Sequence, residues 1–299
     1  MNKWLDINAN NPENAKVLIL GIPFDGGTSQ EAGAAEGPAK LREFGAVYMP
    51  CATDDWHLLD TQPVVYDFGD VDMSGTWEES FARVEKEALA LMRHDKFHLF
   101  LGGDHSVTIP LHKAFAKARK GEKIGIIHFD AHFDLCDCYD GHIWSHANTE
   151  KRALDDIIGP EDLLFLGIRA AEPEEVEIIR LEPAITVLSA SDVDEMGWKE
   201  CAAVIADKFQ GYDHIYFTLD IDVLDPAFAP GTGTPVSGGI TSRELINLVR
   251  FILKNLPVRD MDIVEVAPPL DVNDITSWAA MRIIEEVFSY ADQNLKKGD

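Results

Sequence analysis

Basic residues are scarce in this chain of 299 residues. Only 26 lysines and arginines stand against 52 aspartates and glutamates, which gives a formal net charge of -26. A field of this sign repels phosphate groups, so it argues against nucleic acids and anionic membranes as partners. It attracts metal ions and cationic substrates, although solubility or a salt-rich habitat is the simpler explanation of the charge.

Long apolar runs and cysteines are also few. No apolar run reaches the length that spans a bilayer. The segment from Met1 to Asn14 lacks the basic start and apolar stretch of a signal peptide, which favours a cytoplasmic protein. The four cysteines do not suggest a disulfide scaffold in a chain of this length. Cys136 and Cys138 have the spacing C-x-C instead of the C-x-x-C of structural zinc sites, so we expect ordinary reduced thiols.

Internal repeats, low-complexity tracts and Pro/Ser-rich linkers are absent too, so we expect a single domain over residues 1–299. Short apolar runs alternate with longer amphipathic stretches, and the most apolar runs look buried on both faces. This pattern predicts an α/β fold: a three-layer domain with a mostly parallel eight-stranded sheet and helices on both faces. The expected strands are Val17–Ile22, Pro63–Phe68, Phe97–Leu101, Ile124–Asp130, Leu163–Ile168, Ile185–Leu188, His214–Ile221 and Met261–Val266. The expected helices are Trp77–His94, Val107–Ala118, Glu174–Leu181, Asp194–Phe209, Ser242–Asn255 and Asp274–Leu295.

In open parallel sheets, ligands bind beyond the carboxyl ends of the strands. The expected strand 97–101 ends in Gly102-Gly103-Asp104-His105-Ser106, where the glycines allow a sharp turn and Ser106 can cap the next helix. A single histidine such as His105 is more often structural than functional. No G-K-[ST] follows, so the turn is not a phosphate-binding loop.

The next strand carries a clearer signal. Asp130, His132 and Asp134 follow it at positions i, i+2 and i+4, so their side chains point to one side of an extended segment. One histidine between two carboxylates is costly near a core unless a cation neutralises the cluster. An exposed acidic turn is the alternative, but the apolar and aromatic residues around the three fit it poorly. We therefore expect a metal site here.

The strand 214–221 repeats this pattern, because Asp220 and Asp222 share one face. Neighbouring carboxylates raise each other's pKa unless a metal compensates. With His105, the set has two histidines and four aspartates, which is too many for one catalytic zinc and suits two metals with bridging carboxylates. Oxygen and nitrogen ligands without a thiolate indicate manganese or another hard divalent ion. Glu265, at the end of the last strand, either lies solvated at an edge or holds a cationic group beside the metals.

These motifs resemble the signatures of the ureohydrolase family, which includes arginase and agmatinase. The resemblance covers nearly the whole chain in order, and the run from Leu219 to Pro235 resembles agmatinases more than arginases. The segments that carry it are Gly102–Ser106, Asp130–Asp134, Asp220–Asp222 and Ala229–Pro235, together with Gly21–Asp25, Gly167–Arg169 and Glu265–Pro268.

The resemblance implies an arginase-like fold and two Mn²⁺ ions per subunit, with Ni²⁺ as another possible ion. One ion would be held by His105, Asp130, Asp134 and Asp220, and the other by Asp130, His132, Asp220 and Asp222. It further implies that hydroxide attacks a guanidinium carbon to give urea and an amine. Relatives form trimers or hexamers, so a homo-oligomer is expected.

The resemblance also assigns three catalytic residues. Asp134 would orient the hydroxide, Glu265 would pair with the substrate guanidinium, and His146 would pass a proton to the leaving amine. His142 is a rival for this last role, but the residues around His146 match the family better. Ala147-Asn148 stands where relatives have glycine, which affects the local backbone shape.

Several substrates and activities remain open at this point. Agmatine, which would give putrescine, is the leading candidate, and guanidinobutyrate and guanidinopropionate are alternatives. Arginase activity, a zinc deacetylase of the same fold and a non-catalytic homologue fit the residues less well. The roles of Cys136 and Cys138 are open, and Asp137 or Asp140 is a candidate to meet a distal ammonium group of the substrate.

Overall fold

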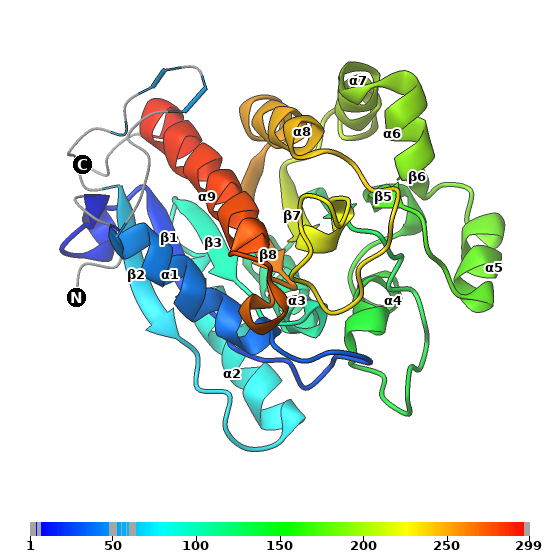
Figure 1. Ribbon diagram of the computed structural model, residues 1–299, viewed down its shortest axis with the longest axis horizontal. Coiled ribbons are helices and arrows are strands. Elements are labelled where there is room, and N and C mark those ends of the chain that lie inside the picture. Colours follow the sequence, from blue (N-terminus) through cyan, green and yellow to red (C-terminus); the bar gives the residue numbers. More distant parts are fainter. Residues whose placement is uncertain are drawn as a thin grey trace.

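Eight β-strands pair side by side in one sheet, in the order β2-β1-β3-β8-β7-β4-β5-β6, and every pairing is parallel (Figure 1). The computed structural model describes residues 4, 7–47, 53–54, 56–57, 59 and 64–295. All eight expected strands are present, and the sheet confirms the predicted α/β class. The strands are β1 Val17–Gly21, β2 Val65–Asp70, β3 Phe97–Leu101, β4 Ile124–Phe129, β5 Leu163–Ile168, β6 Thr186–Ser189, β7 His214–Asp220 and β8 Val258–Val264.

Helices cover both faces of this sheet (Figure 1). On one face α6, α7, α8, α9 and α1 follow one another in contact, and on the other face α2, α3 and α4 do so. The strands are apolar on both sides: Val17 and Ile19 of β1 point into the first core, and Leu18 and Leu20 into the second. The helices are α1 Gly37–Val47, α2 Trp77–Leu91, α3 Thr108–Ala118, α4 Thr149–Asp156, α5 Pro173–Leu181, α6 Ala190–Met196, α7 Trp198–Lys208, α8 Ser242–Asn255 and α9 Ile275–Asn294.

The helix predicted over 194–209 is wrong as one element, because the chain forms α6 and α7 there. Gly197 separates them with φ 76° and ψ 155°, a backbone conformation that residues other than glycine rarely adopt. Helices α1 and α4 were not predicted. The strand expected from residue 63 begins at Val65, and residue 63 lies outside the described part of the chain.

The sheet order places the strands that carry the candidate residues next to one another. β3, β8, β7 and β4 are consecutive in the sheet, so their carboxyl ends form one continuous edge. Within the part of the chain that the structure describes, no helix is both long and apolar enough to cross a membrane. The three cysteines in that part, Cys136, Cys138 and Cys201, are free thiols, and Cys51 lies outside it.

Candidate metal centre

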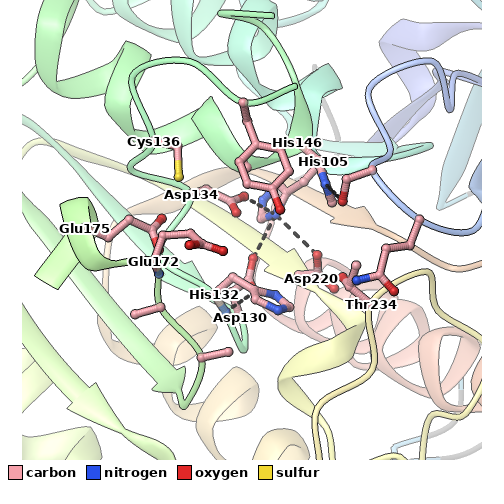
Figure 2. Close-up of a pocket in the computed structure, with 16 residues that line it drawn as sticks. His105, Asp130, His132, Asp134, Cys136, His146, Glu172, Glu175, Asp220 and Thr234 are labelled. Atoms are coloured by element: carbon pink, nitrogen blue, oxygen red, sulfur yellow. Dashed lines mark hydrogen bonds and ion pairs between the residues drawn. The ribbon is translucent and has the colours of Figure 1, made fainter. Parts of the chain in front are cut away.

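The six predicted metal ligands come together at this edge of the sheet. His105 lies in a short 3-10 helix after β3, Asp130, His132 and Asp134 follow β4, Asp220 ends β7, and Asp222 is in the next turn. Figure 2 shows five of these side chains pointing toward one centre. The parallel order of β3, β8, β7 and β4 brings the carboxyl ends of these strands, and with them the two motifs, to the same edge.

His105 forms the hub of one half of the centre. Its Nδ1 lies 2.9 Å from Asp130 Oδ2, 3.1 Å from Asp134 Oδ2 and 3.3 Å from Asp220 Oδ2. Burial lowers the pKa of this imidazole, but the three nearby carboxylates outweigh it and raise the pKa well above its usual value. The three carboxylates around His105 Nδ1 therefore stabilise positive charge at this position.

His132 forms the hub of the other half. Its Nδ1 lies 3.3 Å from Asp130 Oδ1 and 3.2 Å from Asp222 Oδ2. Burial opposes the charged imidazole, but the carboxylates of Asp222 and Asp130 raise its pKa to about 12. Because Asp130 faces both histidines with different oxygens, it is placed to bridge two cations.

Several atoms of this cluster are buried without a hydrogen-bond partner, which tests whether a metal fits. They are His105 Nδ1 and one carboxylate oxygen each of Asp130, Asp134 and Asp222. Burial and the like charges of Asp222 and Asp130 also raise the pKa of Asp220 well above its usual value. Unpaired buried nitrogen and carboxylate oxygen atoms that face one another are what hard divalent ions bind, so the residues fit such ions.

Two groups of residues could each hold a metal ion, because within each group the ligand atoms lie within 4.8 Å of one another. One is Asp130, His132 and Asp222, and the other is His105, His128, Asp130 and Asp134. His128, near the end of β4, was not among the predicted ligands. Its Nε2 lies 3.0 Å from Asp130 Oδ2, and its Nδ1 lies 3.0 Å from Glu150 Oε1. It lies two residues before Asp130, so it points to the same side of the strand, and this spacing is the signal that could have found it.

Asp134 and Glu265 both adopt the left-handed backbone region, with φ of 54° and 61°. Such conformations are uncommon for residues other than glycine and cluster at functional sites. Glu265 is held by its environment, since its N–H donates to the carbonyl of Gly103 and its Oε1 accepts the N–H of His105 at 2.9 Å. Its carboxylate is thus fixed beside the cluster, with only 2% of the residue exposed.

His146 lines the cavity above the metal cluster, whereas His142 does not. The Nδ1 of His146 lies 3.6 Å from Glu265 Oε1, and its Nε2 is 2.9 Å from Ser29 Oγ. Burial opposes its charge, but Glu265 raises the pKa of His146 to about 9. His142 is exposed, and its ring lies 4.6 Å from that of Trp77.

The loop of His146 is tied to the segment after Asp134. The Asn148 side chain donates to the carbonyl of Cys136 at 2.5 Å and accepts the N–H of Ser145 at 2.9 Å. The Cys136 N–H donates to the carbonyl of Ala147 at 3.0 Å. The buried Asn148 side chain therefore fixes the loop that carries His146.

The cavity has a volume of about 210 Å³, and its far wall is acidic. Cys136, Glu172 and Glu175 lie together on one side of the centre, and Thr234 lies on the other (Figure 2). Glu175 accepts the backbone N–H groups of Leu135 and Glu172 at 2.8 Å each, and burial raises its pKa to about 7. Glu172 is exposed at the mouth.

Asp137 and Asp140, the acids considered for a distal ammonium, are not part of the cavity wall. Asp137 instead pairs with Arg152 at 2.7 Å on the surface. Cys136 and Tyr139 of this segment line the cavity, whereas the acids Glu172 and Glu175 that line its wall come from the start of α5.

Comparison with known proteins agrees with this geometry. Residues 15–289 match the model of the arginase family. The chain belongs to the arginase family. The agmatinase of Bacillus cereus is 38% identical over 280 residues, which cover 92% of this chain and 91% of that protein. The resemblance inferred from the motifs is thereby confirmed, and the chain is a hydrolase of this family.

Solved structures agree at the level of the fold. The proclavaminate amidino hydrolase of Streptomyces clavuligerus superposes with a TM-score of 0.86 at 30% identity, covering 95% of this chain and 94% of that one. The agmatine ureohydrolase of Thermoplasma volcanium gives a TM-score of 0.85 at 28% identity, covering 98% and 95%. The names of these two relatives refer to different compounds, proclavaminate and agmatine.

Proposed function

We propose that this family member is a binuclear manganese ureohydrolase that cleaves agmatine to urea and putrescine. The observation that carries the proposal is that two further acids, Glu172 and Glu175, line the same cavity as the metal-ligand cluster. Agmatine has a guanidinium group at one end and an ammonium group at the other. A cavity with acidic groups in addition to the metal ligands suits a substrate with two cationic groups.

The metal assignment is the one that the family resemblance implies, and the contacts of the two histidine hubs support it for every ligand except Asp220 at the second ion. His105, Asp130, Asp134 and Asp220 would hold one Mn²⁺, and Asp130, His132, Asp220 and Asp222 the other. When bound, such a pair lowers the pKa of water, so that a nucleophile is available near neutral pH.

The surrounding side chains position the substrate and move its proton. The Glu265 carboxylate, buried beside His105, would pair with the guanidinium and hold its carbon over the cluster. Asp134 would accept a hydrogen bond from the attacking water and so direct it at that carbon. The water oxygen bonds to the guanidinium carbon, the bond from that carbon to the alkyl nitrogen breaks, and the carbon leaves as the carbon of urea.

His146 is placed to donate the proton that the leaving amine needs. Its pKa of about 9, raised by Glu265 against the effect of burial, keeps the imidazole protonated at neutral pH. A protonated histidine within the cavity is a general acid, because it can neutralise the amine as the bond breaks.

The acidic wall favours agmatine over guanidino acids. Glu175 already accepts two backbone N–H groups, whereas Glu172 faces the cavity from the exposed mouth. A carboxylate there attracts an ammonium group and repels the carboxylate of guanidinobutyrate or guanidinopropionate. We therefore assign Glu172 to the distal ammonium of agmatine.

Urea release from a panel of guanidino compounds, with Mn²⁺-loaded protein, tests the proposal. Agmatine should be the best substrate, and Glu172→Gln should raise its KM about tenfold with little change in kcat. Glu177→Gln, on the exposed face of the same helix, is the matched control and should behave like the wild type. Activity on guanidinobutyrate or guanidinopropionate without activity on agmatine would assign the chain to a sibling enzyme.

Elemental analysis separates the proposal from the zinc deacetylase alternative. Two manganese ions per subunit support it, and one zinc ion per subunit would reject it. Nickel in place of manganese, the trimeric or hexameric state and the cytoplasmic location stay predictions from the sequence.

A further inference from the structure

A second row of polar side chains lies beneath the metal ligands, in the interior of the sheet. Asp262 of β8, Thr218 of β7 and His128 of β4 are paired across the three strands in one register. All three are fully buried, at 0% exposure. Thr218 lies two residues before Asp220, so the row is one step below the ligands and on the same face of the sheet.

Asp262 collects three hydroxyl groups in this row. Its Oδ1 accepts the Thr218 hydroxyl at 2.6 Å, and its Oδ2 accepts those of Thr108 at 2.8 Å and Tyr216 at 2.9 Å. A carboxylate without charge compensation is costly in a core, and three donors in hydrogen-bond range offset that cost. The proposed reaction uses none of these groups, so another explanation for the cluster is required.

The Thr218 hydroxyl also contacts His105, since its Oγ lies 2.8 Å from His105 Nε2. A hydroxyl has a single proton, and that of Thr218 is donated to Asp262. His105 Nε2 must therefore carry a proton and donate it to Thr218. The other ring nitrogen, Nδ1, is the one that faces Asp130 and Asp134 and can be deprotonated to bind a metal.

We infer that Asp262 and Thr218 are positioning residues that act through His105 and present its Nδ1 lone pair to the metal. The carboxylate fixes the direction of the Thr218 hydroxyl, and the hydroxyl fixes the proton on Nε2 and the plane of the ring. Outer partners of ligand histidines commonly hold them in this way, although here a threonine hydroxyl stands between carboxylate and imidazole. The inference rests on the proposed role of His105 as a metal ligand.

The chain offers a matched set of variants for the test. Thr218→Val removes the hydroxyl with little change of shape and leaves His105 Nε2 without its acceptor. Thr108→Val removes a hydroxyl from the same carboxylate, but it lies outside the path to His105 and leaves Tyr216 on Asp262 Oδ2. Thr218→Ser restores the hydroxyl and should rescue the first variant.

Mn²⁺ titration of metal-free, full-length protein, followed by electron paramagnetic resonance, gives the readout. Loss of an outer partner typically weakens metal binding about 10–100-fold. Thr218→Val should bind the ion on the His132 side with wild-type affinity. The resonance signal of two coupled Mn²⁺ ions should appear only at about 10–100 times the wild-type Mn²⁺ concentration. Thr108→Val and Thr218→Ser should form the pair at the wild-type concentration. A coupled pair in Thr218→Val at the wild-type concentration would overturn the inference, as would equal weakening of both ions.

A measurement without metal separates this inference from the proposed function. In metal-free protein with isotope-labelled histidine, the His105 Nε2–H should exchange slowly with solvent in the wild type, Thr108→Val and Thr218→Ser. It should exchange rapidly in Thr218→Val. A rapidly exchanging His105 Nε2–H in the wild type would contradict the positioning role of Thr218 and Asp262. If this proton exchanges slowly but the wild type binds no pair of manganese ions, only the two-metal proposal is contradicted.

Discussion

At the scale of single residues, the site depends on a few side chains whose positions are determined by their neighbours. Glu265 illustrates this, because it holds a left-handed backbone, accepts the N–H of His105 and lies 3.6 Å from His146. One carboxylate thereby contacts the segment after β3 and the histidine proposed to protonate the product. Substituting the residues around this carboxylate one at a time should therefore separate effects on metal binding from effects on proton transfer.

Replacing His146 by asparagine should lower kcat by about 10²–10⁴-fold, the usual contribution of a general acid. Asparagine keeps a polar group on the side of the ring that faces Glu265 but cannot act as an acid toward the amine. The manganese content should stay at the wild-type value, because His146 is not in either ligand group. His142→Asn is the control, since that exposed ring lies outside the cavity wall, and its turnover should match the wild type. Unchanged turnover in the His146 variant would place the proton donor elsewhere.

The candidate metal ligands could be proposed from the sequence, and the row beneath them could not. Asp130, His132 and Asp134 occupy every second position after β4, and this spacing predicts a shared side, although the structure has a bend at residues 130–132 and a left-handed backbone at Asp134. Thr218 and Asp262 lie within apolar strands, where nothing in the sequence distinguishes a satisfied core residue from a positioning one. Their roles depend on register between strands far apart in the chain, which the sequence pattern does not specify.

At the scale of elements, the strands were predicted more successfully than the helices. Buried strands give continuous apolar runs. Helix α4, with the sequence Thr-Glu-Lys-Arg-Ala-Leu-Asp-Asp, has too few apolar residues to show a helical period. The boundary between α6 and α7 was missed for the opposite reason: the apolar spacing continues across Gly197, so the sequence pattern shows no break there.

The break at Gly197 leads to a stability prediction. Its φ of 76° with ψ 155° is nearly exclusive to glycine, and an added Cβ would meet nothing within 4 Å. Gly197→Ala should therefore lower the free energy of unfolding by about 1–3 kcal/mol through the backbone alone. Gly159→Ala, at φ -85°, is the control: its Cβ would meet the end of the exposed Glu161 side chain at 2.7 Å, which can move aside, and stability should change by less than about 0.5 kcal/mol. Urea denaturation measures both, and equal stability of the two variants would contradict the argument.

Helix α9 contains a buried acid that should make stability depend on pH. Burial raises the pKa of Glu285 to about 7, and although Arg282 lowers it, Glu286 raises it further. The unfolded chain has lost this proton by about pH 4.3, so the folded state holds more protons between about pH 4.3 and pH 7. Stability from this group is thus present at low pH and is lost as pH rises through about 7.

Glu285→Gln should remove that loss. Relative to the wild type, its free energy of unfolding should be on the order of 1–3 kcal/mol higher at about pH 8 than at about pH 5. Urea denaturation at the two pH values gives the comparison. A difference that does not change between them would show that Glu285 is not protonated in the folded protein.

At the scale of the whole molecule, the metal centre joins strands from both parts of the chain. β3 comes from the first half, β4 from the middle and β7 and β8 from the last third, and all four are neighbours in the sheet. The parallel order brings their carboxyl ends to one edge, where four aspartates add to a chain whose net charge is -26. Two divalent cations at that edge would relieve repulsion between elements that are distant in sequence.

Removal of the metal should therefore lower the temperature of thermal unfolding, and addition of Mn²⁺ should restore it. The size of the increase should depend on pH, because protons and metal compete for the same atoms. Against burial, Asp222 and Asp130 raise the pKa of His132 to about 12, so the metal-free protein keeps a proton there that binding must displace. As pH rises, that displacement costs less, Mn²⁺ binds more tightly, and ligand binding to the folded state stabilises it further. Unfolding temperatures with and without Mn²⁺ should thus differ more at about pH 8.5 than at about pH 6. An increase that is equal at both would show that the ion binds elsewhere on the acidic surface and not at the histidines of the sheet edge.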